Sequence, residues 1–130
     1  MADTEYFAYG RHVLVDIEDA KFDVLNNLEI LQKSLVSAAV TEGVTVLGTM
    51  SKIFEPCGVT ILLLLAESHV SLHTYPDQGK AFFDAFTCGT GFEPTNIFRC
   101  FAAETLGGSY KITQIPRGDM PAKGPWPWGL

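Results

Sequence analysis

The sequence predicts an α+β fold, a two-layer α/β sandwich in which an antiparallel sheet carries two helices packed on one face. Three observations predict it. Several apolar segments have the length of strands, and two longer segments repeat their apolar residues every three or four positions, as amphipathic helices do. Short turns containing Gly or Pro join most of these segments, which favours antiparallel neighbours.

Length and charge limit the kinds of partner. At 130 residues the chain fits a single domain, 1–130, with one core. Its 9 Lys and Arg residues against 15 Asp and Glu residues give a net charge of −6, which repels phosphate backbones and anionic membrane surfaces. We therefore expect no nucleic-acid partner and no membrane binding. A cationic small molecule is favoured instead.

The N-terminus and the cysteines indicate the compartment. The first ten residues lack the basic and apolar regions of an export signal, and the longest apolar run is far below the ~20 residues that a membrane helix needs. We therefore expect a cytoplasmic protein. The three cysteines, Cys57, Cys88 and Cys100, lack CxxC spacing and are expected to be free thiols.

The first third of the chain predicts a strand and a helix. Residues 11–17 are typical of a strand that follows Gly10. Residues 21–42 predict one amphipathic helix, which Gly43 ends. Its apolar stripe consists of Phe22, Leu25, Leu28, Leu31, Leu35, Ala38 and Ala39.

A hairpin follows. Residues 44–50 predict a second strand that continues to Phe54, and the Pro and Gly of 55–58 predict a turn. The apolar segment 59–66 is then a third strand, antiparallel to the second. Its unbroken apolar run indicates a sheet that is apolar on both sides, so we expect a second copy of the chain to cover the face without helices, giving a homodimer.

The rest of the chain predicts one more helix and one more strand, and it contains one segment that fits either a helix or a strand. Propensity does not decide between helix and strand for residues 80–87. After a glycine-rich loop, 87–91, a second helix begins at Glu93 with Pro at an early position, and Gly107 and Gly108 end it. A final strand, 110–115, precedes a Pro- and Gly-rich tail, 116–130, that is expected to be irregular, with Trp126 and Trp128 fastening it to a surface.

Residues 67–76 concentrate the candidate chemistry, because they hold two of the three histidines, two serines, a carboxylate and an aromatic ring. The glycine-rich phosphate loops, the GxSxG elbow and the HExxH zinc motif are absent from the sequence. His69 and His73 are four residues apart, which on a strand separates them by ~13 Å, so we expect no metal site. Each of these residue types also has an ordinary structural use, as a turn cap, a hydrogen-bonded core group or a small apolar side chain.

Three motifs carry a family resemblance. Glu67-Ser-His-x-Ser-x-His-Thr-Tyr-Pro76, Phe86-Thr-Cys-Gly89 and Gly10-Arg-His12 resemble the short prokaryotic type of S-adenosylmethionine decarboxylase in order and spacing. The likeness runs from about Gly10 to Arg117. It implies a self-processing enzyme that makes the aminopropyl donor for spermidine synthesis.

The resemblance also implies roles for individual residues. The chain would cleave itself between Glu67 and Ser68, and Ser68 would become a covalent pyruvoyl cofactor, which supplies the electron sink that ordinary side chains lack. His73 would act as acid and base in cleavage, and Thr60 stands where the family commonly has serine. Cys88 would donate the proton to the α-carbon after CO₂ leaves.

Substrate contacts follow from the same resemblance. Phe54 and Tyr75 match aromatic positions that sandwich the adenine ring of S-adenosylmethionine. Asp77 falls where the family usually has glutamate in contact with the ribose hydroxyls. Glu67 and Ser71 would lie nearby, where carboxylates and aromatic faces suit a sulfonium cation.

A straight strand over 67–75 would place Ser68 and His73 on opposite faces, ~17 Å apart. We therefore predict a turn at residues 67–69, with later strand pairing that returns His73 to the side of Ser68. Three readings remain open at this stage: the S-adenosylmethionine decarboxylase, the same pyruvoyl machinery acting on another amino acid such as arginine, and an uncleaved, noncatalytic binding module.

Overall fold

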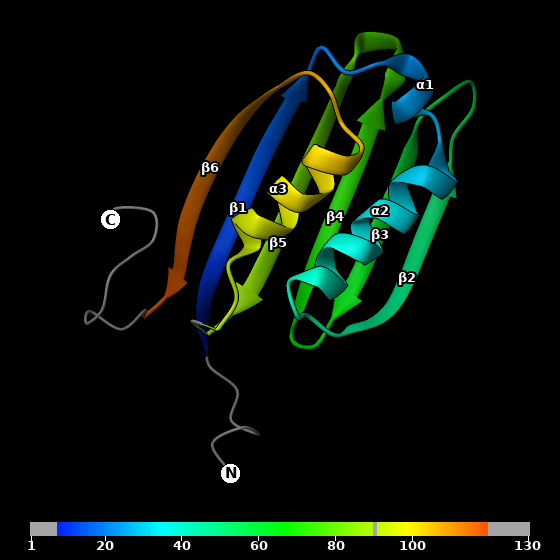
Figure 1. Ribbon diagram of the computed structural model, residues 1–130. Coiled ribbons are helices and arrows are strands. Elements are labelled where there is room, and N and C mark those ends of the chain that lie inside the picture. The colour runs from blue at the N-terminus through cyan, green and yellow to red at the C-terminus, as the bar shows by residue number, and fades with distance from the viewer. Residues whose placement is uncertain (1–7, 90, 120–130) are drawn as a thin grey trace.

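A six-stranded antiparallel sheet with the strand order β2-β3-β4-β5-β1-β6 forms one layer of the molecule (Figure 1). The structure is a computed structural model that describes residues 8–89 and 91–119. Sequential hairpins build the β2–β5 half, whereas β1 lies between β5 and β6. The strands are β1 (Tyr9–Glu18), β2 (Val46–Ile53), β3 (Val59–Leu65), β4 (Ser68–Tyr75), β5 (Lys80–Cys88) and β6 (Ser109–Gly118).

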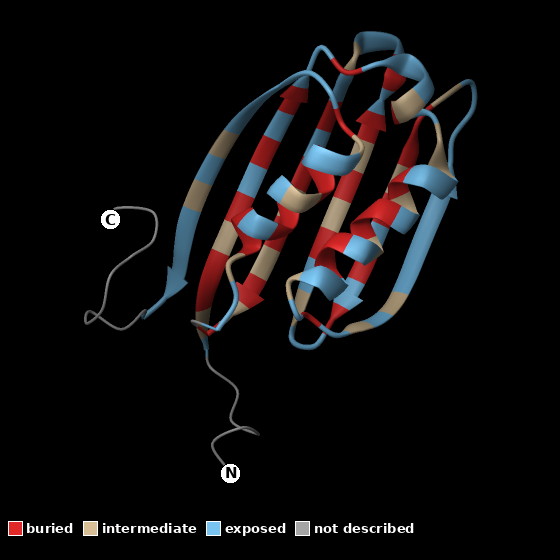
Figure 2. Ribbon diagram, in the orientation of Figure 1, coloured by how far each residue is buried: buried red, intermediate tan, exposed pale blue. Residues whose placement is uncertain are grey.

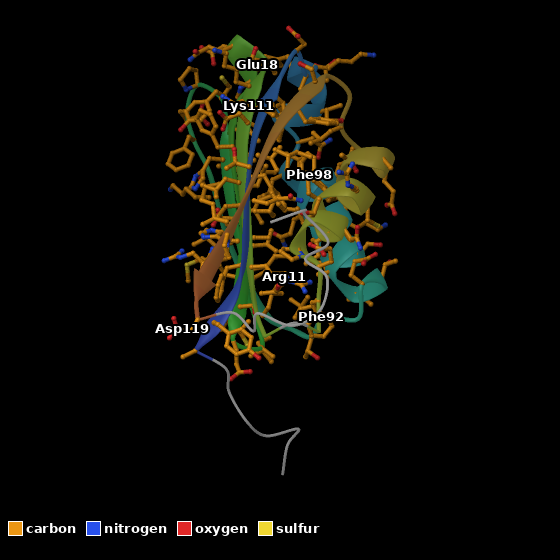
Figure 3. All side chains as sticks on the ribbon, turned by 90° about the vertical axis from the view of Figure 1, so that its left-hand side faces the viewer. Arg11, Glu18, Phe92, Phe98, Lys111 and Asp119 are labelled. Atoms are coloured by element: carbon orange, nitrogen blue, oxygen red, sulfur yellow. The ribbon has the colours of Figure 1, made fainter. Side chains whose placement is uncertain are left out.

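The helices form the second layer, all on one face of the sheet (Figure 3). They are α1 (Phe22–Leu25), α2 (Leu28–Thr41) and α3 (Pro94–Glu104), and a 3₁₀ turn, η2 (Pro76–Gln78), links β4 to β5. Buried and exposed residues alternate along the inner strands, because every second side chain points at the helices (Figure 2). The predicted two-layer sandwich is confirmed. Its core combines Val13, Val15, Ile17, Leu31, Leu35, Ile61, Leu63, Leu72, Phe83, Ile97, Phe98 and Phe101.

The predicted single helix over 21–42 is wrong, because the chain leaves the helix between α1 and α2. The Asn27 side chain accepts a hydrogen bond from the Ile30 backbone N–H (3.1 Å) and so starts α2 afresh. The Asn26 side chain accepts from Gly58 N–H (2.9 Å) in the β2–β3 turn. Asparagine satisfies backbone donors at helix starts better than it serves a helix interior, so the pair interrupts the helix although the apolar period continues past it.

Two further segments settle questions that the sequence left open or answered wrongly. Residues 80–88 form a strand, β5, with Phe83 and Thr87 among the residues that face the helices. The tail was expected to be irregular from Pro116, but β6 continues to Gly118, with Pro116 opposite Arg11. An edge strand tolerates the missing N–H of proline. The expected anchoring role of Trp126 and Trp128 lies outside the described residues.

We call the sheet face opposite the helices the outer face. In Figure 3 the side chains of this face project away from the helical layer. It exposes a group of large apolar side chains, which is unusual for a surface that meets water alone. They are Leu14 (37% exposed), Met50 (72%), Leu62 (42%), Leu64 (60%) and Phe82 (45%). Within residues 8–89 and 91–119, no helix has the length and apolar character required to cross a membrane.

Candidate active site

The turn between β3 and β4 presents the first candidate residues. Ala66 and Glu67 form the turn, and Leu65 pairs with Ser68 across it. Glu67 has φ of 61°, in the left-handed region that side chains other than glycine adopt at a cost of about 1 kcal/mol. The predicted bend is thus confirmed at Glu67, while Ser68 and His69 already belong to β4. The peptide bond between Glu67 and Ser68 therefore joins a strained turn to a regular strand.

Cys88, the last residue of β5, lies beside this turn. Its backbone N–H donates a hydrogen bond to Ser68 Oγ at 3.2 Å, and its thiol lies 3.6 Å from Glu67 Oε1. The same alternation that buries Thr87 against the helices directs Cys88 to the outer face. Glu67, Ser68 and Cys88, here called the turn cluster, thus form one group at one end of the sheet.

A buried arginine fastens the loop that follows Cys88. Arg11, on the helix side of β1, donates from Nη1 to the Phe92 carbonyl and to Glu93 Oε2, both at 3.3 Å. The Thr87 hydroxyl donates to the same Phe92 carbonyl at 3.4 Å. Figure 3 shows Arg11 and Phe92 near each other between the sheet and the helical layer. These bonds hold Phe92 and Glu93 against β1 and β5, next to the end of β5 that carries Cys88.

A second group of candidate residues lies at the other end of the sheet. Thr60 on β3 pairs with His73 on β4, and its hydroxyl is 3.0 Å from His73 Nδ1. The Tyr75 ring packs edge-on against Phe82 with centroids 5.5 Å apart. Asp77 follows in η2, and Phe54 begins the β2–β3 turn at the same end, 47% exposed. Phe54, Thr60, His73, Tyr75 and Asp77 are here called the far cluster.

The two clusters do not meet within one chain. β4 pairs with β3 without interruption from Ser68 to His73, so the expectation that strand pairing returns His73 to Ser68 is wrong. Five residues of extended strand separate them by roughly 17 Å and place their side chains on opposite faces. His69, Ser71 and His73 instead line a groove of about 640 Å³ on the outer face, together with Met50 and Leu62. A hollow of about 780 Å³ between α2 and β2 contains none of the candidate residues.

An aspartate on β5 organises a polar network in the outer face. Asp84 Oδ2 lies 2.7 Å from His12 Nε2 and 2.8 Å from His69 Nε2, and Asp84 Oδ1 accepts a hydrogen bond from the Ser71 hydroxyl. Burial acts to raise the pKa of Asp84, but the hydrogen bonds from His69, Ser71 and His12 together hold that pKa well below its ordinary value. The hydrogen bond to Asp84 raises the pKa of His69. The carboxylate is therefore ionised at neutral pH and links β1, β4 and β5.

The same three side chains are close enough to hold a metal ion, since their ligand atoms lie within 4.8 Å of one another. The contact between Arg117 Nη1 and His12 Nδ1, at 2.9 Å, argues for protons instead. A guanidinium can only donate, so Nδ1 is the acceptor and the proton of His12 sits on Nε2, where it points at Asp84. A metal ion needs that Nε2 lone pair, so the geometry favours a hydrogen-bonded network of His12, His69, Ser71 and Asp84.

Sequence reasoning missed Asp84 and gave His12 no role. The signal was present in residues 80–88, where Phe82, Asp84 and Phe86 alternate with buried residues at a period of two. The same segment also fits a helical turn, so the alternation alone does not assign it to a strand. Only the pairing of β5 with both β1 and β4 brings Asp84 to the two histidines.

Comparison with known proteins decides the family. The family model described as S-adenosylmethionine decarboxylase matches residues 11–118, which include both clusters and the network. The chain belongs to the S-adenosylmethionine decarboxylase family. The resemblance of the three sequence motifs is thereby confirmed.

Individual relatives of this S-adenosylmethionine decarboxylase family member agree. An S-adenosylmethionine decarboxylase proenzyme of Brevibacillus brevis is 49% identical over 90 residues, covering 69% of this chain and 68% of that protein. A proenzyme of Symbiobacterium thermophilum is 43% identical over 103 residues, covering 79% of this chain and 77% of that protein. The crystal structure of the adenosylmethionine decarboxylase from Aquifex aeolicus matches with a TM-score of 0.75 at 26% identity, over 92% of this chain and 99% of that one.

Proposed function

We propose that this chain is a pyruvoyl-dependent decarboxylase of S-adenosylmethionine that first cleaves itself between Glu67 and Ser68. Membership of the family supports the reaction, and the word proenzyme in the names of the relatives supports a processed precursor. The turn cluster carries the proposal within this chain, because it combines a strained peptide, a serine hydroxyl and a thiol.

Cleavage begins at the serine. Ser68 Oγ attacks the Glu67 carbonyl, the Glu67–Ser68 C–N bond breaks, and an ester forms in its place. Loss of the α-proton of residue 68 and rupture of its Cβ–Oγ bond then release a 67-residue fragment that ends in the Glu67 carboxylate. Water replaces the nitrogen of the resulting dehydroalanine, ammonia leaves, and a pyruvoyl group begins the second fragment. The left-handed φ of Glu67 supports this site, since breaking the bond relieves the strain of the turn.

The residues around position 68 fit such a group. A pyruvoyl carbonyl condenses with the substrate amine and accepts the electrons that CO₂ leaves on the α-carbon. The Cys88 N–H, which bonds Ser68 Oγ at 3.2 Å, lies where it can bind an oxygen at position 68. The Cys88 thiol lies next to the same position and serves as the proton donor to the α-carbon.

Two copies of the chain are needed to complete the site. The turn cluster and the far cluster lie at opposite ends of the sheet, and the outer face between them exposes large apolar side chains beside the Asp84 network. A two-fold axis that runs between two such faces and across their strands places the far cluster of one copy beside the turn cluster of the other. The Ser68 side chain leaves β4 on the helix side, but it is only half-buried at the very end of the strand and so can be reached there. We therefore propose a homodimer in which His73 and Thr60 of one copy serve cleavage of the other.

The far cluster then holds the substrate. Phe54 and Tyr75 expose 47% and 42% of their surface, so their rings are accessible to the adenine. Asp77 accepts hydrogen bonds from the ribose hydroxyls, and Glu67 lies near the sulfonium. The net charge of −6 favours a cationic substrate.

Denaturing mass spectrometry of freshly purified protein tests the proposal. The wild type should give fragments of 67 and 63 residues, the second with a blocked N-terminus that borohydride reduces. The Ser68→Ala variant should remain one uncut chain. Release of CO₂ from carboxyl-labelled S-adenosylmethionine, with arginine as the matched alternative, identifies the substrate. An uncut wild-type chain would reject cleavage, and decarboxylation of arginine alone would reject the substrate.

A further inference from the structure

Cleavage after Glu67 would remove the covalent bond that holds residue 68, the residue that becomes the reactive group, in its place. The inference below rests on the proposed function, since it concerns the chain that starts at residue 68. In the uncut chain, the turn of Ala66 and Glu67 ties the start of β4 covalently to β3. Once that tie is broken, residue 68 is a free chain end, and chain ends fray unless other bonds hold them.

The backbone pairing of β4 with its neighbouring strands gives residue 68 little support by itself. Ser68 pairs with Leu65, which after cleavage is only two residues from the new C-terminus at Glu67. On the other side, the first pair with β5 joins His69 to Phe86. One neighbour of the reactive end is therefore itself a chain end. The fixed neighbour is β5, which the continuous pairing with β1 holds in the middle of the sheet.

Two side chains at the start of β4 are tied to a single carboxylate on that fixed neighbour. His69 and Ser71, on the same face of the strand, both bond Asp84, one at each carboxylate oxygen. His12 bonds the same carboxylate from β1, and Arg117 on β6 bonds His12. The contacts thus run in a row across β4, β5, β1 and β6. They attach β4, whose first residue would become a free chain end, to three strands that cleavage leaves unchanged.

We propose that Asp84 is a positioning residue, which clamps His69 and Ser71 and thereby keeps residue 68 beside Cys88 after cleavage. The carboxylate is suited to this task because charge-assisted hydrogen bonds are stronger than neutral ones and three donors converge on it. In the uncut chain the turn holds the same end, so the clamp matters chiefly after the cut. This difference separates it from a general contribution to folding.

Hydrogen exchange of the two forms tests the clamp. Asp84→Asn is introduced into the wild type, which cleaves, and into the uncut Ser68→Ala chain. In the cleaved protein, amide exchange in the peptide that starts β4 should accelerate about tenfold, as expected for the loss of charged hydrogen bonds. In the uncut chain the same change should be under about threefold, because the turn still closes the strand end. Asp23→Asn, an equal change of charge at an exposed position of α1 in the helical layer, is the control and should change neither form.

Kinetics supply the second readout. In cleaved protein, Asp84→Asn should lower kcat about tenfold and change KM less than about twofold, since the reactive end is misplaced while the far cluster still binds the substrate. Asp84→Glu retains the charge and should recover part of kcat. Should Asp84→Asn fail to fold or to cleave, His69→Gln and Ser71→Ala, which remove one bond to Asp84 each, carry the same comparison.

The outcomes separate the clamp from the proposed function. Equal acceleration of exchange in the cut and uncut forms, or an unchanged kcat, would overturn the clamp and leave the decarboxylase assignment standing. A wild-type chain that stays uncut would overturn both. A divalent metal that binds wild type stoichiometrically, and that Asp84→Asn abolishes, would replace the clamp with a metal site.

Discussion

Ser68 and His73 belong to the same strand, and yet their side chains leave β4 on opposite faces of the sheet, five residues apart. No rotation of side chains within one chain brings the two together, because an extended strand keeps this separation at roughly 17 Å. If both take part in cleavage, they come from different copies. The homodimer is therefore a requirement of the proposed chemistry as well as a way to cover apolar surface.

Complementation between two inactive variants checks this requirement. Ser68→Ala lacks the nucleophile and His73→Ala lacks the acid and base, so each protein alone should remain uncut. In a mixed dimer, the His73→Ala chain has its own Ser68 and receives His73 from its partner. Refolding an equal mixture should therefore cut about half of the His73→Ala chains, if copies pair at random.

The chains differ in mass, so spectrometry reports which one is cut. A mixture of Ser68→Ala with the double variant Ser68→Ala/His73→Ala serves as the control and should show no cut chain. Cleavage of His73→Ala on its own at the wild-type rate would contradict the shared site.

The left-handed turn at Glu67 predicts a difference between two substitutions that remove the same carboxylate. Glycine adopts φ of 61° without strain and alanine does not, so in the uncut Ser68→Ala background Glu67→Gly should be more stable than Glu67→Ala by about 1 kcal/mol. Denaturant unfolding measures this difference. With Ser68 present, the glycine variant should cleave more slowly than the alanine variant, because the relieved strain no longer assists. Equal stabilities would remove backbone strain from the account.

Stability of the uncut Ser68→Ala chain should depend on pH through the Asp84 network. The pKa of His69 is raised in the folded state, so its contribution is full below the unfolded value of about 6.5 and is lost as the pH rises through the folded pKa. The pKa of Asp84 is lowered, so its contribution is present above the unfolded value of about 4 and is lost only as the pH falls toward the folded pKa. The network therefore stabilises most between about pH 4 and pH 6.5.

The loss of stability above about pH 6.5 is the part of this pH dependence that an unfolding experiment can measure. Because 46% of the His69 side chain is exposed, the free energy of unfolding should fall by less than about 1 kcal/mol between about pH 5.5 and pH 9. His69→Gln should flatten this slope, whereas the control variant Asp23→Asn should keep it. A slope that persists in His69→Gln would assign it to another group.

Cys88→Ala should separate processing from turnover. The thiol touches Glu67 but is not the nucleophile, so cleavage should proceed to completion. Decarboxylation should fall about 100-fold, as expected when a positioned acid is lost. Fragment masses and CO₂ release on the same sample measure the two effects. Full turnover without the thiol would remove Cys88 from its role as proton donor.

The sequence predicted the two layers of the fold better than it predicted which elements lie next to one another. An unbroken apolar run was sufficient to predict β3, and the apolar period was sufficient to predict α3, because burial governs both residue choice and structure there. The apolar period gave a wrong prediction at Asn26 and Asn27. There, hydrogen bonds to the two side chains compete with the helix and leave the apolar period intact. It also failed at Pro116, since only the position of β6 at the sheet edge makes proline acceptable in a strand.

The candidate site shows the same division. The turn at Glu67 was predicted from a requirement that one chain does not meet, since Ser68 and His73 still lie five residues apart on β4. The relation of Asp84 to His12 and His69 was not, since it depends on which strands flank β5, and no local pattern encodes a partner 72 residues away. Nor does periodicity reveal that Cys88 and Ser68, 20 residues apart, share a hydrogen bond.

The two border strands of the sheet are poor templates for further strands. β2 carries an irregular register between Val46 and Gly48 and the charge of Lys52, and β6 carries Pro116, which has no N–H to offer. Lateral growth of the sheet into fibrils is thereby discouraged at both margins. The broad outer face remains as a surface through which two copies can meet, so the geometry that discourages fibrils is also the one that the proposed homodimer uses.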